Sequence, residues 1–513
     1  DPPYNTGNDF VYEDDFAQNT AEYLEISGQF DEEGNRLVKN LDSNGRFHTD
    51  WLNMMYPRLR LAKDLLRDDG AIFISINDRE QENLKKICDE IFGAINFTAC
   101  IPWQSRLSMQ NDTDFSVNHE YIIVYAKNRR LENRRLKEGN AGTWYQKDSF
   151  VFRPLPLDKS KFDNPDNDPR GLWKADPFDA PNVRPNLTYP VINPKTGDQH
   201  LPPSGRCWRI SPEKFSSALA EGRIVFGKNG TGRPQMKSFY EEKKDFGSID
   251  NSWFSGDKIG TTTAGTKELQ ALFDKAPFDT PKPISLLIKL MTLGFVEDND
   301  FILDFFSGSA TTAHAVMQLN AEDGGKRKFI MVQLPEKTDE KSEAFKAGYE
   351  NICEIGKERI RRAGQKIKEE KGLEAQNLDI GFRVLKLDST NMEDVYYSPA
   401  DFDPTLFESM ADNIKEGRSP EDLLFQVMLD LGVLLSSKIE ESTIGGKKVF
   451  NVAEGYLIAC FDENVDDEVI IEIAQKKPYY FVMRDSSMAN DSVATNFEQI
   501  FKTYSPETIR KVL

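Results

Sequence analysis

The chain has 513 residues, which at about 150 residues per domain predicts roughly three domains. No window comes near the ~18 consecutive apolar residues of a membrane-spanning helix, and the first residues, DPPYNTGNDF, lack the features of a secretory signal, so we expect a cytoplasmic protein without membrane contact. Five scattered cysteines without C-x-x-C spacing argue against a disulfide framework or a structural zinc site, and the net charge of −19 taken alone argues against a nucleic-acid partner.

Residues up to about 128 alternate between helical and strand patterns. Apolar residues at spacings of three or four predict an amphipathic helix over 51–66, and the run AIFISI (71–76) predicts a buried strand. A second helix is predicted over 80–92, and HEYIIVYAK (119–127) predicts a further strand. Alternation of this kind predicts a parallel sheet covered by helices.

The middle of the chain differs from the rest in charge and in proline content. Residues 127–240 hold 21 Lys+Arg and 12 Asp+Glu, a balance of +9, so the other 399 residues carry −28. One basic segment inside an acidic protein favours a nucleic-acid partner, despite the negative net charge of the whole chain. Eleven prolines lie between residues 154 and 203, which excludes regular helix or central strand there and predicts an irregular, loop-rich insertion.

After the insertion, the alternation of strand and helix resumes. FILDFF (301–306) predicts a strand, TTAHAVMQL a helix and KFIMVQL a second strand, which together form one βαβ unit. A long charged helix is predicted over 342–371. The last part, 381–513, has 13 basic and 24 acidic residues, a balance of −11. We predict strands over VFNVAEGYLIACF, EVIIEI and YYFVM, together with helices, which is typical of an α+β domain.

The first four residues, Asp1-Pro2-Pro3-Tyr4, combine a carboxylate, two prolines and an aromatic ring. Neither proline can donate a backbone hydrogen bond, and their fixed φ holds the carbonyl groups in place. Such a stiff turn can accept both hydrogens of an exocyclic amine while the ring stacks on the attached base. An ordinary proline turn is the alternative interpretation of these four residues alone.

A second candidate site, Asp304 to Ser309, lies between a predicted strand and a predicted helix. An acidic residue and a Gly-Ser turn at that junction are typical of the ligand crevice of an open α/β sheet. It is not a phosphate loop, because no G-x-x-x-x-G-K-[ST] occurs in the chain. A plain strand-to-helix turn is the alternative interpretation. The four histidines are too dispersed for a metal site, and we expect no metal.

Together the two motifs resemble the amino-methylating DNA methyltransferases in which D-P-P-Y precedes the cofactor loop. More closely, the chain resembles the modification (Mod) subunit of type III restriction-modification systems. The resemblance extends from residue 1 to beyond residue 430. It is carried by the stretches DPPYNTGNDFVYEDDF, WLNMMYPRLRLAKDLLRDDGAIFISINDRE, NHEYIIVYAKN, HLPPSGRCWRISPEKF, EGRIVFGKNGTGRP, TPKPISLLIKLM, DFFSGSATTAHAVMQLN and RSPEDLLFQVMLDLGVLLSSKIE.

The resemblance implies an α/β fold in which a Rossmann-like, seven-stranded methyltransferase core carries an inserted irregular target-recognition domain and a C-terminal α+β domain. The implied domains are the catalytic half of the core (1–128), the DNA-binding target-recognition domain (129–275), the cofactor half of the core (276–340), a helical linker (341–380) and a C-terminal domain for assembly or partner docking (381–513).

The resemblance also implies the chemistry. S-adenosylmethionine would donate a methyl group to adenine N6 of a base flipped out of duplex DNA. In the implied catalytic motif Asp1, Pro2, Pro3 and Tyr4, the Asp1 carboxylate and the Pro2 carbonyl accept the amine hydrogens and Tyr4 stacks on the base. The implied cofactor-binding residues are Lys282, Pro283, Asp304, Phe306, Ser307, Gly308 and Ser309. The basic cluster expected to face DNA is Arg206, Arg209, Arg223, Lys228 and Arg233.

The expected partners follow from the same resemblance. The chain has no Walker A sequence and no obvious nuclease cluster, so ATP hydrolysis and DNA cleavage are expected on a separate restriction (helicase-nuclease) subunit, and a Mod homodimer is expected. Two other functions stay open: cytosine-N4 methylation, because D-P-P-Y serves either amine, and DNA binding without methyl transfer. A protein-glutamine methyltransferase fits less well, because that family uses N-P-P-Y after its cofactor loop.

Three departures from the family pattern limit what carries over. The numbered sequence begins at Asp1 without the apolar strand expected before it, which predicts a longer parent protein. The cofactor loop ends in Ala310 where many relatives have Gly. Gln333 stands where an acidic ribose ligand is expected, and Glu336 is the alternative for that role.

Overall fold

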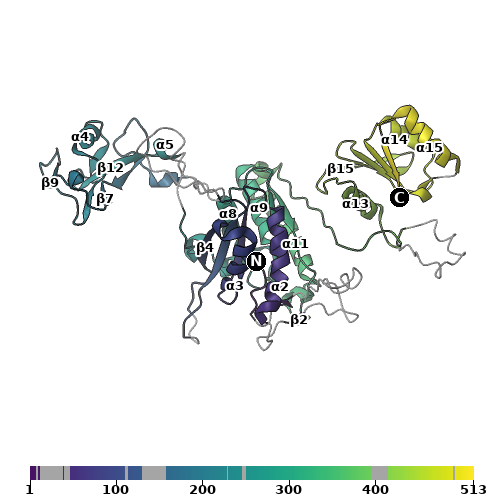
Figure 1. Ribbon diagram of the computed structural model, residues 1–513, viewed down its shortest axis with the longest axis horizontal. Helices are drawn as coiled ribbons and strands as arrows, with labels where there is room; N and C mark the ends of the chain where they lie inside the picture. Colours follow the sequence, from purple (N-terminus) through teal and green to yellow (C-terminus); the bar gives the residue numbers. More distant parts are fainter. Residues whose placement is uncertain are drawn as a thin grey trace. The chain divides into compact units, whose positions relative to one another are not determined.

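The computed structural model describes residues 1–6, 10–11, 38–39, 47–109, 114–129, 157–227, 229–244, 250–393, 414–488 and 491–513. It divides into two compact units, Asp1–Phe382 and Arg383–Leu513, and each is described by itself (Figure 1). Within the described residues, no helix combines the length and the apolar character that crossing a bilayer requires.

The first half of the core contains the helices and strands that the sequence predicts, with small shifts at their ends. The helix predicted over 51–66 begins four residues earlier, and the second helix ends in a π-helical turn, Asp89–Gly93. A two-residue antiparallel pair, β1 (Phe10–Val11) with β2 (Val38–Lys39), precedes these elements. The main elements are α2 (Phe47–Leu65), β3 (Ala71–Ile76), α3 (Gln81–Cys88), β4 (Phe97–Gln104) and β5 (His119–Ala126).

The pairing in this half corrects the expected parallel sheet. The strand order is β3-β5-β4, and both pairs are antiparallel. Parallel neighbours need a crossover connection, usually a helix, whereas the described residues between β4 and β5 contain no helix. One face of the sheet packs its isoleucines, such as Ile74 of β3, against α2 and α3. The other face, including Trp103 and Val124, packs against α8 (Ile284–Leu293), so the sheet lies between helical layers.

The second half of the core contains the predicted βαβ unit. Strands β13 (Phe301–Asp304) and β14 (Lys328–Met331) are parallel, and α9 (Thr311–Asp323) connects them. Helix α9 is almost wholly buried from Thr311 to Met317, because it packs against α8 and against α11 (Ile352–Lys371). Short helix α6 (Gly256–Ile259) and helix α7 (Thr262–Phe273) precede α8 in this half.

The single helix predicted over 342–371 is wrong, because the chain breaks after α10 (Glu343–Lys346). Gly348 adopts a φ of +89°, which a right-handed helix excludes. The Asn351 side chain then accepts a hydrogen bond from the Glu354 backbone N–H and caps a new helix.

The inserted segment, residues 157–244, consists of short strands and two helices around its own core of side chains such as Phe178, Trp208 and Phe215. The proline-rich stretch adopts only short strands, and Pro177 ends β6 at the edge of the order β11-β12-β6, where a missing N–H is tolerated. The elements are β6 (Trp173–Pro177), β7 (Asp179–Pro181), β8 (Val191–Ile192), β9 (Gln199–His200), β10 (Arg206–Trp208), α4 (Pro212–Ala220), β11 (Ile224–Phe226), β12 (Pro234–Phe239) and α5 (Tyr240–Lys243).

The C-terminal unit is a five-stranded mixed sheet, order β15-β16-β17-β18-β19, with α13 on one face and α14 and α15 on the other. The strand predicted over EVIIEI (468–473) is wrong, because this stretch lies in α14. The Asp466 side chain caps that helix, and its buried residues, Val469, Ile470, Ile473 and Ala474, recur at helical spacing. The elements are α13 (Pro420–Asp430), β15 (Ile439–Ile444), β16 (Lys447–Val452), β17 (Leu457–Cys460), α14 (Asp467–Gln475), β18 (Tyr480–Met483), α15 (Asp491–Tyr504) and β19 (Ile509–Val512).

Candidate active site

The two motifs found in the sequence lie together in the folded core. Tyr4, at the end of the D-P-P-Y motif, packs against the same apolar cluster as Phe305 and Phe306 of the second motif. Asp304 is the last residue of β13, so the motifs meet at the carboxyl end of a parallel strand, the usual place of a ligand site in such sheets.

Hydrogen bonds with residues of α2 hold the D-P-P-Y turn in place. The Trp51 indole N–H donates a hydrogen bond to the Pro3 carbonyl at 2.8 Å. The next residue, Asn5, is fully buried with a φ of +56°, and its amide donates to Glu80 Oε1 at 2.6 Å and to the Phe47 carbonyl at 3.2 Å. Among the described residues no donor reaches the Pro2 carbonyl, so that oxygen stays available to a ligand.

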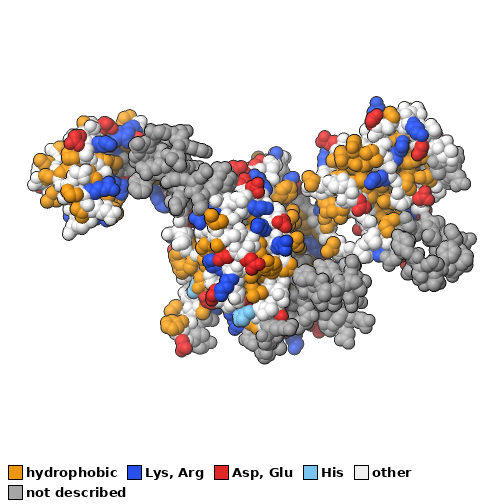
Figure 2. Space-filling view, in the orientation of Figure 1, with side chains coloured by type: hydrophobic (Ala, Val, Ile, Leu, Met, Phe, Trp, Pro, Cys, Tyr) orange, Lys and Arg blue, Asp and Glu red, His pale blue; other side chains and the backbone are white. Residues whose placement is uncertain are grey.

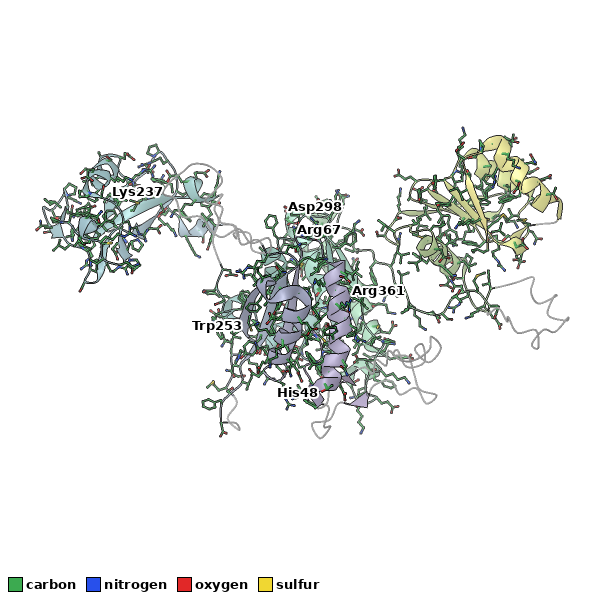
Figure 3. All side chains as sticks on the ribbon, in the orientation of Figure 1. His48, Arg67, Lys237, Trp253, Asp298 and Arg361 are labelled. Atoms are coloured by element: carbon green, nitrogen blue, oxygen red, sulfur yellow. The ribbon has the colours of Figure 1, made fainter. Side chains whose placement is uncertain are left out.

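Glu80 is a fully buried carboxylate that the sequence analysis did not single out. Besides Asn5, the Asn83 amide donates to it at 2.8 Å, and His48 Nδ1 lies 2.6 Å from its Oε1. His48 belongs to the first turn of α2 (Figure 3), whereas Asn83 belongs to α3. A buried charge is tolerated when donors surround it, and these contacts connect the D-P-P-Y motif to α2 and α3.

Lys282, expected in the cofactor pocket, contacts the catalytic motif. Its Nζ lies 3.1 Å from Asp1 Oδ2 and 3.2 Å from Glu120 Oε2. It also lies 5.1 Å from the centre of the Tyr4 ring, within reach of a cation–π interaction. The side chain is only 11% exposed, so these contacts occur in a largely desolvated place. A direct role of Lys282 toward the cofactor stays a prediction.

The segment that carries Lys282 lies unusually close to α7. A Cβ on Gly265 of α7 would lie 2.2 Å from the Pro281 carbonyl oxygen, so only glycine permits this approach. Three residues further along α7, the Glu268 carboxylate accepts a hydrogen bond from the Ile284 N–H at 2.9 Å and thereby caps α8. Burial raises the pKa of Glu268, and the nearby Arg359 guanidinium opposes that rise.

The turn of the second motif is held by its own acidic residue. Asp304 Oδ2 accepts from the Thr312 hydroxyl at 2.6 Å, and Oδ1 accepts from the Phe306 N–H at 3.3 Å. Gly308 adopts a φ of +49°, and a Cβ there would lie 3.2 Å from the Phe278 ring. Its N–H donates to Gln333 Oε1 at 2.8 Å, so Gln333 supports the turn from the end of β14.

Ala310 adopts a left-handed φ of +59°, the conformation that glycine accepts without strain. This geometry explains why glycine at this position suits the wider family. Arg359 of α11, which the sequence analysis did not identify, supports both neighbours of Ala310. Its Nη1 donates to Ser309 Oγ at 2.9 Å and to Thr311 Oγ1 at 2.6 Å. Burial lowers the pKa of Arg359 to about 10, so the guanidinium keeps its charge at neutral pH.

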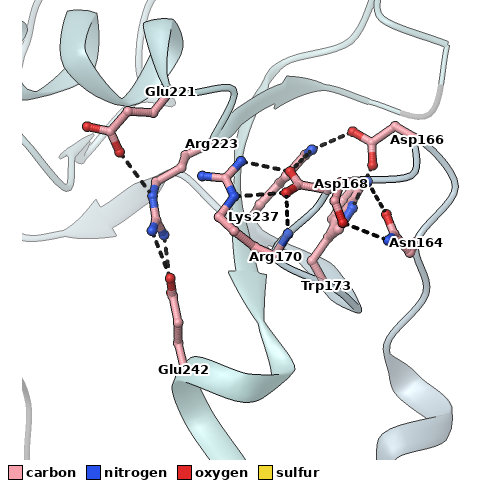
Figure 4. Close-up of polar contacts among 9 residues, drawn as sticks. All are labelled: Asn164, Asp166, Asp168, Arg170, Trp173, Glu221, Arg223, Lys237 and Glu242. Carbon is pink, nitrogen blue, oxygen red and sulfur yellow. Dashed lines mark hydrogen bonds and ion pairs between the residues drawn. The ribbon is translucent and has the colours of Figure 1, made fainter.

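The five basic residues expected to face DNA are not equivalent. Arg206 is paired with the Asp179 carboxylate. Arg223 forks onto the Glu242 carboxylate, with the closest contact at 2.7 Å, and also pairs with Glu221 (Figure 4). Arg209 is exposed, and its Nε donates to the Asp179 backbone carbonyl at 3.2 Å. Arg233 is exposed and forms no ion pair with the described residues, whereas Lys228 lies outside them.

More of the positive charge of this segment is neutralised internally. The Lys237 ammonium, 4% exposed, contacts the carboxylates of Asp166 and Asp168 (Figure 4). The Arg170 guanidinium also donates two hydrogen bonds to the Asp168 carboxylate, from Nε at 2.8 Å and from Nη2 at 2.7 Å, and it lies over the Phe239 ring. The Arg170 hydrogen bonds, aided by Lys237, lower the pKa of Asp168, which therefore stays ionised. The unpaired cations of the segment are thus fewer than the 21 Lys and Arg counted over residues 127–240, although its net charge of +9 is unchanged by this pairing.

The fold and the paired motifs have a counterpart among known families. A sequence model of the DNA methylase family matches residues 1–363, which contain both motifs and the inserted segment. The chain therefore belongs to the DNA methylase family.

Similar proteins include modification subunits of type III restriction-modification enzymes. The chain is 37% identical over 392 residues to the StyLTI Mod subunit of a type III restriction-modification enzyme from Salmonella typhimurium (strain LT2). That match covers 75% of the chain and 55% of the relative. It is 31% identical over 545 residues to the EcoP15I Mod subunit of Escherichia coli, covering 97% of the chain and 77% of that relative. The family to which the resemblance in the sequence points is thereby confirmed.

Replacement of Arg359 tests whether the buried guanidinium supports the cofactor turn. Arg359→Met keeps much of the side-chain volume but removes the donors to Ser309 and Thr311. Hydrogen bonds to a charged group contribute about 1.5–3 kcal/mol, so we expect S-adenosylmethionine to bind about 10- to 100-fold more weakly by calorimetry. Arg361→Met, on the exposed side of the same helix, is the matched control and should leave the affinity unchanged. An unchanged affinity in a folded Arg359→Met variant would contradict this role.

Proposed function

We propose that this chain is the modification subunit of a type III restriction-modification system. It transfers a methyl group from S-adenosylmethionine to adenine N6 at a specific site in duplex DNA. The observation that carries this proposal is the meeting of Asp1–Tyr4 with the Asp304–Ser309 turn on one apolar cluster. The similarity to Mod subunits supports the same function, and a cytoplasmic location belongs to the proposal.

The residues around the second motif fit a sulfonium methyl donor. S-adenosylmethionine supplies an electrophilic methyl group when it is bound. The half-buried Phe306 offers an aromatic surface, and the Gly308 turn leaves the backbone open to close approach. Lys282 adds the ammonium group next to Asp1. We therefore assign the donor to Lys282, Pro283, Asp304, Phe306, Ser307, Gly308 and Ser309.

The first motif keeps acceptors free for an exocyclic amine. Lys282 contacts Asp1 Oδ2, which leaves Oδ1 of this 38% exposed side chain, and the Pro2 carbonyl receives no donor from the described residues. These two oxygens accept the two amine hydrogens and direct the nitrogen lone pair outward. When bound, the donor would supply its methyl group to this nitrogen, and the Asp1 carboxylate, which accepts an amine hydrogen, would take up the proton that the amine loses. Holding the amine in this orientation accounts for much of the rate.

The target base must leave the duplex stack to reach these acceptors, so base flipping is part of the proposal. Tyr4 provides the ring on which the flipped base stacks. Burial, with the Glu120 carboxylate beside it, raises the pKa of Tyr4 well above its ordinary value, and the phenol therefore stays neutral. The inserted segment serves as the target-recognition domain, in which Arg209 and Arg233 are the exposed members of the basic cluster among the described residues.

The full architecture is also a proposal. The sheets β4-β5-β3 and β13-β14 are parts of one seven-stranded core, because the site residues of both lie on a shared apolar cluster. The domain limits expected from the sequence are kept, with two refinements. Helix α11, within the stretch expected as a helical linker (341–380), packs on α9 and so belongs to the core. Residues 254–273, assigned to the inserted domain, pack on the core through Phe254 and α7.

The C-terminal unit is proposed for assembly. It is acidic and so repels DNA, yet it exposes large apolar side chains on its surface (Figure 2), among them Leu429, Leu434 and Val512. Such surfaces are typical of protein contacts. We propose a homodimer and docking of a restriction subunit through this unit.

Replacement of Asp1 tests the proposed catalytic role. Asp1→Ala should abolish methyl incorporation into DNA while DNA affinity stays within about threefold, because the carboxylate acts on the amine and not on phosphates. Mass spectrometry of nucleosides from DNA treated with the unmodified chain should give N6-methyladenine. N4-methylcytosine there would support the cytosine alternative, and DNA binding without any methylated base would support the non-catalytic one.

The salt dependence of DNA binding tests the corrected basic cluster. Each phosphate contact adds about 0.9 to the magnitude of the slope of log affinity against log salt. The double substitution Arg209→Ala and Arg233→Ala should lower that magnitude by up to about 1.8. Arg223→Gln is the control, because this guanidinium is already paired with Glu242, and it should leave the slope unchanged. Equal slopes for the double variant and the unmodified chain would place both arginines away from DNA.

Truncation tests the role of the C-terminal unit. A chain that ends at Phe382 keeps the first compact unit whole, so S-adenosylmethionine should bind it with unchanged affinity. Light scattering should show loss of the dimer and of any complex with the restriction subunit. Retention of both assemblies by the truncated chain would contradict the assembly role.

A further inference from the structure

Glu120, at the start of β5, connects the side chains of Asp1 and Tyr4 in the D-P-P-Y motif. The Tyr4 hydroxyl donates to Glu120 Oε2 at 2.8 Å. The Lys282 ammonium lies 3.2 Å from the same oxygen and 3.1 Å from Asp1 Oδ2. One carboxylate thus touches the aromatic ring directly and reaches the Asp1 carboxylate through a single ammonium group.

Glu120 lies on a rigid part of the core. It is opposite Trp103 in the β4–β5 pairing, and Trp103 is fully buried with its indole N–H bonded to the Gly260 carbonyl at 3.0 Å. The Glu120 side chain is 17% exposed. Groups placed on strands and held by packing keep a site more precise than groups on loops.

The Glu120 carboxylate changes how strongly Lys282 interacts with Asp1. Without Glu120, the ammonium of Lys282 would pair with Asp1 alone and compete with an incoming amine for that carboxylate. With Glu120 present, the attraction is shared between two carboxylates at nearly equal distances. At the same time the hydrogen bond from Tyr4 fixes the direction of the phenol and hence the tilt of its ring.

We propose that Glu120 is a positioning residue for amine methylation, which acts through Tyr4 on the stacking ring and through Lys282 on the amine acceptor. This inference rests on the proposed function and adds to it. Glu120 itself touches no reacting atom. Its loss should therefore lower kcat, with little effect on the binding of DNA or of S-adenosylmethionine.

Four variants of the full chain separate the two contacts. Glu120→Gln keeps an acceptor for Tyr4 but loses the charge that attracts Lys282, Tyr4→Phe removes only the hydroxyl, and Glu120→Ala removes both contacts. We expect Glu120→Ala to lower kcat about 10- to 100-fold, with smaller losses for the other two. The double variant Tyr4→Phe with Glu120→Ala should be little slower than Glu120→Ala, because the hydroxyl has then already lost its carboxylate partner and only Ser75 stays beside it.

Base stacking gives a readout that a purely structural role would not change. Duplex DNA with 2-aminopurine at the target position should fluoresce differently with Glu120→Ala than with the unmodified chain, because the ring that quenches the flipped base is no longer fixed. The Tyr56 hydroxyl and Glu90 form a similar 2.8 Å hydrogen bond on the core surface and provide the control. Tyr56→Phe and Glu90→Gln should keep kcat and fluorescence within about twofold of the unmodified chain.

Two results would overturn the inference. Unchanged kcat and fluorescence in a folded Glu120→Ala variant would show that the carboxylate positions nothing, as would losses that multiply in the double variant. A failure of the proposed function appears differently, since the unmodified chain would then methylate no DNA amine and the positioning role would fall with it.

Discussion

A charge removed from water must find partners inside the protein, and this constraint fixes the candidate active site. Glu80 is the clearest case, because its buried carboxylate is surrounded by side chains from the motif and from two helices. Arg359 meets the same requirement only in part, because its Nη1 donates to two hydroxyls beside the left-handed Ala310 whereas its buried Nε and Nη2 have no hydrogen-bond partner among the described residues. Apart from Asn83, the partners of both groups are distant in sequence, so these contacts exist only in the folded core.

The same constraint shapes the inserted segment in a different way. There, buried and half-buried cations such as Lys237 and Arg170 form ion pairs with aspartates of the same segment. Their charge stabilises a small fold that has few regular elements, and it is not available to a phosphate backbone. A charge balance counted along the sequence gives the net charge of the segment, but it does not show which cations are unpaired and can contact a phosphate.

Local patterns in the sequence were enough to predict many elements. The alternation of AIFISI matches β3 residue for residue, and the parallel βαβ unit is confirmed, because both depend on neighbouring residues. The antiparallel pairing of β3, β4 and β5 depends on which distant strands meet, and local periodicity carries no such information. In α14, β-branched residues favoured a strand, but the Asp466 cap and helical spacing of the buried residues prevailed.

At the site, the two motifs could be recognised from residue types and spacing, whereas their supports could not. Glu80, Glu120 and Arg359 lie in ordinary helical or strand sequence, and apart from Asn83 their partners are at least 32 residues away. A single acidic residue at the start of an otherwise apolar strand was the one available signal for Glu120. The contacts that surround it arise from the fold.

Because residues 157–244 enclose their own apolar core, the methyltransferase core does not rely on them to cover its interior. A block of this kind can be exchanged for another of different sequence without uncovering the packing beneath Asp1 and Asp304. Under the proposal that these residues recognise the target, sequence preference can diverge by recombination of one contiguous gene segment, at a pace independent of the chemistry. Two lineages then share one reaction and methylate different sites.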